Sequence, residues 1–435
     1  MNQRLVPGLT VALVVLLLAM GLPGSPGHAA AAISLSLWSG YPELTPIFQS
    51  AAADYKKAHP NVTITILTTE LRDYERKLAA SIPAGTAGDI LQVDYTTMDR
   101  YIEAGLIPKA PPDIVQFVHS RSFGETSRDH VTVGGDVYGV PYYAGIGVLY
   151  YNTGMFKEAG LAGPPKTMDE LMSDAQKLAK RDAQGRLVRS GISFRLFGAG
   201  SGVAQKFEIL MWPRGGNLLV SSGRGKYKAG YDNEAGRATL AMHLDALYKY
   251  QVDTLDLKHD AEAFELSQTA MFARESWVIG DIAKKVPTLQ YMTAPMPRDK
   301  RWGTLFSTGN LYISQTAKDP SVAGDFIKFL VEPQYERQML EQVGWIPLRQ
   351  DVNYDPVLVK IPQYKAFLFR NKDFVYWSEP FLKDFDEIQT RLADRLVAAF
   401  RDRSLAGNPS GIAQALHAAA EETNSILRRD GLYAP

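Results

Sequence analysis

The strongest constraint on the fold is a regular alternation of strand-like and helix-like segments at the start of the chain. Residues 33–38 and 62–67 carry apolar side chains at every second position, which is the spacing of a half-buried strand. Residues 89–93 form a third apolar stretch, and helical patterns beginning at Thr45 and Leu71 separate the three. Strands joined by helices in this way pair in parallel and are covered by those helices. The pattern therefore predicts an α/β fold with a parallel sheet.

The rest of the chain repeats this alternation over a length that exceeds one typical domain. The chain has 435 residues, which favours two or more domains. Further helix starts are predicted by a capping box at Thr167 to Glu170 and by the pairs Asp319-Pro320 and Asn408-Pro409. We find no internal repeat and no long low-complexity linker. If two lobes form, short ordered segments must join them.

The N-terminus has the pattern of a secretory signal peptide. Arg4 precedes an apolar run over residues 9–20, glycines and prolines end that run, and the small residues Ala29–Ala32 follow. A membrane anchor is the alternative, but the run is shorter than the roughly 20 apolar residues of a membrane span. We expect residues 1–31 to be a signal peptide that is cleaved near Ala30–Ala32. The sequence contains no cysteine, which excludes disulfides and a lipid-anchor Cys, so we expect a free periplasmic protein.

Charge and motif content exclude several classes of function. Lys and Arg together number 47, as do Asp and Glu, so the chain lacks the basic excess of a nucleic-acid-binding protein. The seven histidines show no His-x-x-x-His pair, and we expect no metal site. The glycines at 198, 200 and 202 lack the dinucleotide-binding spacing, and we expect no cofactor.

The stretch Val137-Tyr-Gly-Val-Pro-Tyr-Tyr143, followed by Gly147-Val-Leu-Tyr-Tyr-Asn152, carries a family resemblance. It resembles the family 1 extracellular solute-binding proteins, the group that includes maltose-type binding proteins. The resemblance spans residues 33–427 and rests on the order and spacing of several modest matches. Further matching pieces lie at residues 88–90, 103–108, 155–161, 164–167, 169–171, 270–272, 323–330 and 344–349.

The resemblance implies a two-lobed periplasmic binding protein (Venus-flytrap) fold of the type II-like kind, with three chain crossings. We expect the crossings near residues 141–145, 294–297 and 344–349. The lobes of such a fold close over ligand by hinge motion. The expected division of the mature chain is an N-terminal lobe of residues 32–142 plus 296–345 and a C-terminal lobe of residues 143–295 plus 346–435.

The resemblance further implies a periplasmic substrate-binding component of an ABC importer. Such a protein captures a sugar, here expected to be a di- or oligosaccharide, and delivers it to the membrane permease subunits. We expect a monomer that is not an enzyme. Binding of a glycerophosphate or another polyol remains an alternative, because Arg195, Arg214, Arg274 and Arg349 lie near candidate loops. A secreted carbohydrate-active enzyme using paired carboxylates, and a sensor that presents sugar to a receptor, are further alternatives.

A sugar site needs flat aromatic rings for the apolar ring faces and directional polar groups for the hydroxyls. Aromatic and polar residues follow the first strand, and Asp94 and Tyr95 follow the third, at the sheet edge where ligands bind in such folds. Asp94 is either a hydroxyl acceptor or a helix cap. One of Tyr142 and Tyr143 is expected to face the cleft.

Other candidates come from later loops. The family often places a stacking ring at the position of Trp277, and Arg349 is either a ligand contact or a structural ion-pair partner. The loop that holds Trp212 and Asn217 contains two glycines that allow close backbone approach, or it is a plain turn. The full set of candidate ligand-binding residues is Trp38, Ser39, Tyr41, Glu43, Asp94, Tyr95, Tyr143, Trp212, Asn217, Glu275, Trp277, Gly309, Asn310, Trp345 and Arg349.

Overall fold

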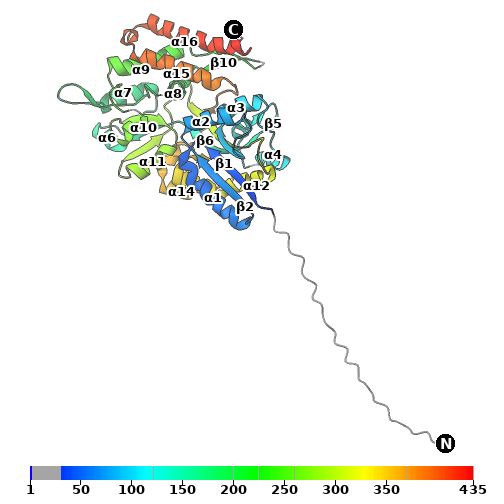
Figure 1. The fold of residues 1–435 in the computed structure, drawn as a ribbon. Coiled ribbons are helices and arrows are strands. Elements are labelled where there is room, and N and C mark those ends of the chain that lie inside the picture. The colour runs from blue at the N-terminus through cyan, green and yellow to red at the C-terminus, as the bar shows by residue number, and fades with distance from the viewer. Residues whose placement is uncertain are drawn as a thin grey trace.

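The computed structural model describes residue 1 and residues 31–434, apart from residues 121, 199, 224, 259 and 370. The predicted signal-peptide run therefore lies outside the described residues. None of the described helices is both long and apolar enough to cross a membrane. Figure 1 shows β1, β2 and α12 gathered at one end of the molecule, while α9, α15 and α16 cover the opposite end.

A mixed sheet forms the first half of the architecture. β1 pairs in parallel with β2 and with β3, which confirms the parallel arrangement expected from the first three strand segments. β14 then pairs antiparallel with β3 and β6, so the complete sheet is mixed, in the order β15-β6-β14-β3-β1-β2, with β16 beside β14. Its strands are β1 (Ile33–Ser39), β2 (Val62–Thr68), β3 (Ile90–Asp94), β6 (Gly139–Ile146), β14 (Gly303–Ile313), β15 (Ile346–Pro347) and β16 (Val375–Trp377).

A smaller antiparallel sheet forms the centre of the second half. Its order is β12-β7-β13, and short two-stranded ribbons are separate from both sheets. These strands are β12 (Met271–Arg274), β7 (Val148–Asn152) and β13 (Tyr291–Ala294), with the ribbons β4 (Thr132–Val133)–β5 (Asp136–Val137), β8 (Lys180–Arg181)–β9 (Leu187–Arg189) and β10 (Leu219–Gly223)–β11 (Lys226–Ala229).

The chain passes between the two sheets through short segments. Only Gly147 separates β6 of the mixed sheet from β7 of the smaller sheet. The chain returns between β13 and β14 and leaves the mixed sheet again after β15. Because β6 continues to Ile146, the first passage lies just beyond the predicted range of 141–145.

Helices cover both sheets and bury two large apolar cores. Leu35 of β1 packs with Phe48 of α1 and Phe326 of α12 in one core. Phe207 of α8 and Leu392 of α15 belong to the other. The helices are α1 (Thr45–Ala58), α2 (Leu71–Ser81), α3 (Tyr95–Glu103), α4 (Pro112–Val118), α5 (Glu125–Asp129), α6 (Thr153–Glu158), α7 (Met168–Leu178), α8 (Gly202–Met211), α9 (Glu234–Leu244), α10 (Asp260–Glu265), α11 (Trp277–Lys285), α12 (Pro320–Leu330), α13 (Pro333–Gln338), α14 (Asp355–Lys360), α15 (Phe385–Arg401) and α16 (Pro409–Arg429).

The predicted capping residues begin their helices as expected. The Thr167 hydroxyl accepts a hydrogen bond from the Glu170 backbone N–H at 3.1 Å at the start of α7. The Asp319 carboxylate accepts from the backbone N–H of residue 322, and the Asn408 side chain accepts from that of residue 411. Each bond satisfies a backbone donor that has no partner within its own helix.

A β-bulge shapes the centre of the mixed sheet. Gly309 pairs with Tyr143, but the next residue, Asn310, pairs with Pro141, so Tyr142 is the extra residue of the bulge. A proline lacks the backbone N–H that a central strand needs, and a bulge tolerates it. Gly309 lies directly under the Tyr143 ring, where an added Cβ would overlap the ring atoms. The absence of a side chain at residue 309 therefore lets Tyr143 pack against β14.

Replacing Gly309 by Ala should destabilise the fold, because the new methyl group would collide with the buried Tyr143 ring. We expect a loss of about 1–3 kcal/mol in the free energy of unfolding, as for other overpacked sites. Urea unfolding followed by circular dichroism measures this change. Gly163→Ala is the matched control, because an added Cβ at residue 163 meets nothing within 4 Å. Equal midpoints for the two variants would contradict this account.

Candidate ligand-binding cleft

A cleft of about 450 Å³ lies between the mixed sheet and the second half of the molecule. The loops after β1, β2 and β3 form one wall, at the carboxyl edge of the parallel strands. The start of α8, the end of β12 and the start of α11 form the other wall, and Val343 to Trp345 contribute where the chain approaches β15. This volume falls within the range of small-molecule sites.

Three aromatic rings meet on the first wall. The ring centroids of Tyr41 and Tyr143 are 5.7 Å apart, and those of Tyr41 and Trp345 are 5.5 Å apart, both in edge-to-face geometry. The rings of Tyr143 and Trp345 are 4.4 Å apart. Tyr143 and Trp345 are almost completely buried, so their positions are fixed by packing before any ligand arrives.

Two carboxyl groups accept hydrogen bonds from the polar atoms of these rings. Asp94 accepts from the Tyr41 hydroxyl at 2.6 Å and from the Tyr143 hydroxyl at 3.2 Å. Glu43 accepts from the indole N–H of Trp345 at 3.0 Å. Asp94 occupies the capping position of α3, but its side chain turns to the two tyrosines instead of the helix. The alternative of a simple helix cap is therefore wrong.

Burial changes the ionisation of these carboxyl groups. It raises the pKa of Asp94 to about 6, although the hydrogen bonds from Tyr41 and Tyr143 act in the opposite direction. Burial also raises the pKa of Glu43 above its ordinary value. Asp94 therefore exchanges its proton closer to neutral pH than an exposed aspartate does.

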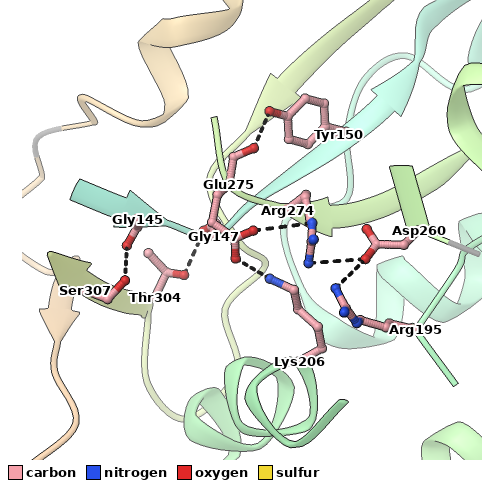
Figure 2. A network of polar contacts seen from close by, with 10 residues as sticks. All are labelled: Gly145, Gly147, Tyr150, Arg195, Lys206, Asp260, Arg274, Glu275, Thr304 and Ser307. Atoms are coloured by element: carbon pink, nitrogen blue, oxygen red, sulfur yellow. Dashed lines mark hydrogen bonds and ion pairs between the residues drawn. The ribbon is translucent and has the colours of Figure 1, made fainter. Parts of the chain in front are cut away.

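The second wall holds a chain of alternating charges, shown in Figure 2. Glu275 contacts the ammonium group of Lys206 and lies 3.4 Å from the Arg274 guanidinium. Asp260 lies 3.3 Å from Arg274 and 3.1 Å from Arg195. Burial alone would raise the pKa of Glu275, but Lys206 and Arg274 lower it to about 2. Glu275 is thus a permanently ionised hydrogen-bond acceptor at the cleft.

One hydrogen bond joins this network to β7, and two further bonds join β14 to the neighbouring passage between the sheets (Figure 2). The Tyr150 hydroxyl of β7 donates to the backbone carbonyl of Glu275 at 2.8 Å. The Thr304 hydroxyl of β14 donates to the carbonyl of Gly147 at 2.7 Å, and the Ser307 hydroxyl donates to that of Gly145 at 3.3 Å. The charged wall is therefore anchored directly beside the passage between the sheets.

The structure brings seven of the sequence-predicted residues together in this cleft. Trp277 lines the same cleft as the buried rings of Tyr143 and Trp345. The ring of Trp277 lies 5.2 Å from the Arg274 guanidinium. Tyr142 turns away and stacks on Phe48, which settles which of the two adjacent tyrosines faces the cleft. The seven residues are Tyr41, Glu43, Asp94, Tyr143, Glu275, Trp277 and Trp345.

Four other predicted residues on the mixed sheet do not line the cleft. Trp38 points to the far side of β1, where Lys77 lies 4.3 Å above its ring. The Ser39 hydroxyl is buried and donates to Gln92 at 2.6 Å. Tyr95 stacks on His130 with ring centroids 3.9 Å apart. Asn310 is buried and donates to the Tyr312 hydroxyl at 3.1 Å. These side chains point away from the cleft because successive residues of a strand face opposite sides of the sheet, or because they pack in the core.

The remaining four predicted residues lie outside the cleft, where each contacts other residues of the protein. Gly309 supports Tyr143 from below and does not line the cleft. Trp212 stacks on Trp377 at 5.7 Å, and the side-chain oxygen of Asn217 accepts from Arg301 at 3.3 Å. Arg349 forms an ion pair with Asp351 at 2.6 Å, so the ion-pair alternative describes its position.

Several cleft residues were missed in the sequence. Arg72 and Glu75 lie on α2, just after β2, and form an ion pair at 2.6 Å. The rule that ligands gather at the carboxyl ends of parallel strands would have found them, because β2 ends at the same edge as β1. Gln205 of α8 and Glu379 come from segments without such a signal.

The cleft presents acceptors, donors and rings for binding an organic solute. Among the residues that the structure describes, no three His, Asp or Glu side chains are grouped so as to hold a metal ion. Fixed rings, an ionised Glu275 and a set of hydroxyl and amide groups are the arrangement expected of a solute-binding protein.

The chain belongs to the family of bacterial extracellular solute-binding proteins, whose family model matches residues 50–366. The maltotriose-binding protein of Pyrococcus abyssi is 23% identical over 333 residues, which cover 75% of this chain and 68% of that protein. The family model describes binding proteins, and the name of this relative also records binding and not catalysis.

Solved structures show the same two-lobed fold. A solute-binding protein of an ABC transporter from Thermotoga lettingae, bound with α-D-tagatose, matches with a TM-score of 0.77, 21% identity and coverage of 91% of this chain and 100% of that chain. A protein of Mycobacterium tuberculosis in complex with glycerophosphocholine matches with a TM-score of 0.76, 16% identity and coverage of 92% and 100%. The predicted two-lobed α/β fold is therefore confirmed.

The free energy of unfolding of Asp94→Asn should increase relative to that of the wild type as pH rises. The folded-state pKa of Asp94, about 6, lies above the ordinary value of 3.8, so folding favours the protonated form. That stabilisation is complete below the ordinary pKa and is lost as pH rises through about 6. Between about pH 5 and about pH 7.5, we expect urea unfolding to show a relative gain for the variant of about 1 kcal/mol.

The exposed residue Asp129 provides the control for this pH dependence. Asp129→Asn makes the same change in charge, and we expect its stability relative to the wild type to stay flat over this interval. A difference for Asp94→Asn that is equally flat would show that Asp94 ionises as freely in the folded protein as in the unfolded chain.

Proposed function

We propose that the chain is the substrate-binding component of an ABC importer and captures a sugar, expected to be a di- or oligosaccharide. The observation that carries the proposal is the cleft itself, in which fixed aromatic rings on one wall face the ionised Glu275 on the other. Sugar rings offer apolar faces to aromatic side chains, and their hydroxyls donate to carboxylates. Relatives whose names record maltotriose, lactose and arabinooligosaccharide binding support this choice.

The transport step follows from hinge closure over the ligand. The lobes expected from the sequence are residues 32–142 plus 296–345 and residues 143–295 plus 346–435. We place the first boundary a few residues later, at Gly147, because β6 stays in the mixed sheet to Ile146, and we propose that β6, β14 and β15 form the hinge. A sugar that contacts both walls stabilises the closed form by the contacts that exist only there. The permease subunits would recognise the closed monomer. We propose that this happens in the periplasm after removal of the signal peptide near Ala30–Ala32, without a lipid anchor.

The anionic alternative receives less support from the cleft. An anion such as a glycerophosphate needs basic groups that are free to bind it. Arg195 and Arg274 are instead held by Asp260 and Glu275. Arg214 and Arg349, the other two candidates, do not line the cleft. The carboxylates of the cleft suit hydroxyl and other hydrogen-bond donors better than phosphate.

Trp277→Ala should weaken sugar binding by about tenfold or more, because the variant loses a stacking surface at the cleft. The sugar is first identified by calorimetric screening of mono-, di- and oligosaccharides, and the affinity of the variant is then measured in the same way. Small-angle scattering with that sugar should show a smaller radius of gyration for the wild type, which reports closure.

Trp38→Ala is the matched control, because this tryptophan lies on the far side of β1 and outside the cleft. We expect its affinity to equal that of the wild type. If none of the saccharides binds, sugar capture is refuted. Products with new reducing ends after incubation with oligosaccharides would instead indicate an enzyme.

A further inference from the structure

The cleft is acidic although the chain as a whole is neutral. Among the described residues that line it, eight carry carboxyl groups and four carry cationic groups. The complete sequence has equal numbers of acidic and basic residues. The acidic excess is therefore a local property of the binding surface, and it bears on the charge of the ligand.

Half of these carboxyl groups already have a cationic partner. Glu75 pairs with Arg72, and Glu275 pairs with Lys206 and Arg274. Asp281 lies 2.7 Å from Lys285, and Asp386 lies 3.7 Å from Arg100. The cluster around Glu275 also contains Asp260, so the three cations Lys206, Arg274 and Arg195 face two carboxylates. The second wall therefore has one positive charge in excess and does not favour a cationic ligand.

The other four carboxyl groups have no cationic partner within the described part of the chain. Glu43 accepts from the Trp345 indole and from its own backbone N–H, and Asp94 accepts from two tyrosine hydroxyls. Glu379 accepts from the Gln389 amide, while Glu70 is exposed at the start of α2. Lys284 is the corresponding unpaired cation of the lining among these described residues, and it is exposed at the rim. Because burial raises the pKa of Glu379 to about 8, this group is protonated near neutral pH, and the negative surplus is confined to Glu43, Glu70 and Asp94 on the first wall.

Burial makes the ionised form of two neighbouring carboxyl groups costly. Glu379 is 7% exposed and interacts with Glu208, which is 4% exposed and has a carboxyl oxygen without a hydrogen-bond partner among the described atoms. Burial raises the pKa of Glu379 to about 8, and Asp94 adds to this effect. Buried carboxyl groups without a counter-charge gain most when a cation enters beside them.

The aromatic wall favours the same kind of ligand. The Tyr41 and Tyr143 hydroxyls donate to Asp94, and the Trp345 indole donates to Glu43. Their hydrogen-bonding edges thus point at carboxylates. Tyr41 is the partly exposed ring among these three, and an aromatic face attracts cations.

We propose that the saccharide captured in this cleft carries a protonated amine, so that the natural ligand is an amino sugar or an oligosaccharide that contains one. The ammonium group lies against the wall formed by Glu43, Glu70 and Asp94, and the sugar ring lies against the aromatic residues. This inference rests on the proposed sugar-binding function and adds the charge of the ligand to it.

The test compares saccharides in which an amine replaces the hydroxyl at carbon 2, in one ring or in both rings. Glucose, galactose and mannose are each paired with their 2-amino forms, and cellobiose is paired with the glucosamine dimer of the same linkage. The N-acetyl forms provide uncharged ligands of larger size. Calorimetry with the full chain, just below neutral pH and at low salt, should show the amine binding about five- to tenfold tighter than the hydroxyl in each pair that binds. Added salt should reduce this preference.

Variants identify the groups responsible. Glu43→Gln keeps an oxygen that can accept from Trp345 but removes the charge, and it should lose most of the preference for the amine. Glu103→Gln makes the same change at an exposed position at the far end of α3 and should retain the preference. Refolding defects are detected by comparing the melting temperatures of the two variants.

Each result has a distinct meaning. An amine preference that falls in Glu43→Gln and with added salt supports the inference. Binding of the neutral sugars with equal or greater affinity than the amines overturns the inference and leaves sugar capture standing. If Glu43→Gln and the double variant Glu43→Gln/Glu70→Gln both keep the preference for the amine, the assignment to this wall is overturned. Binding of none of the saccharides overturns sugar capture and the inference together.

Discussion

The geometry of the cleft depends on how Tyr143 is held in the mixed sheet. Its backbone pairs with Gly309, whose missing side chain leaves space for the ring. Its hydroxyl donates to Asp94 and accepts from the Gln92 amide, and its ring packs on Trp345. Three separate parts of the chain are therefore fixed relative to one another by one side chain. If this ring moved, the carboxylate and the indole of the first wall would move with it.

The two walls use different electrostatics. Ion pairs with Lys206 and Arg274 keep Glu275 ionised, whereas Asp94 has only neutral hydrogen-bond donors and is closer to its protonated form. A buried ion pair contributes little net stability, because desolvation offsets the attraction between the charges. The second wall is therefore better explained as a rigid arrangement of acceptors and donors than as a device that stabilises the fold.

Sequence reasoning predicted the fold better than the site. Alternating apolar residues predicted β1 and β2, and a third apolar stretch predicted β3 and its parallel pairing. Capping residues predicted the starts of α7, α12 and α16. For the site, position at a strand end selected Asp94, which lines the cleft, but also selected Tyr95, whose ring is buried against His130. The direction of a side chain depends on packing between distant segments, which local sequence does not contain. The charge pairs around Arg195 and Arg274 were hidden for the same reason.

The passage from β6 to β7 through Gly147 limits how the lobes can turn. The carbonyl of this glycine is held by the Thr304 hydroxyl of β14, so the backbone at the crossing has few free torsion angles. A crossing of this kind behaves as a restricted hinge and not as a flexible linker. It would guide the lobes along a single path, and a membrane partner could then distinguish a loaded molecule from an empty one by shape alone.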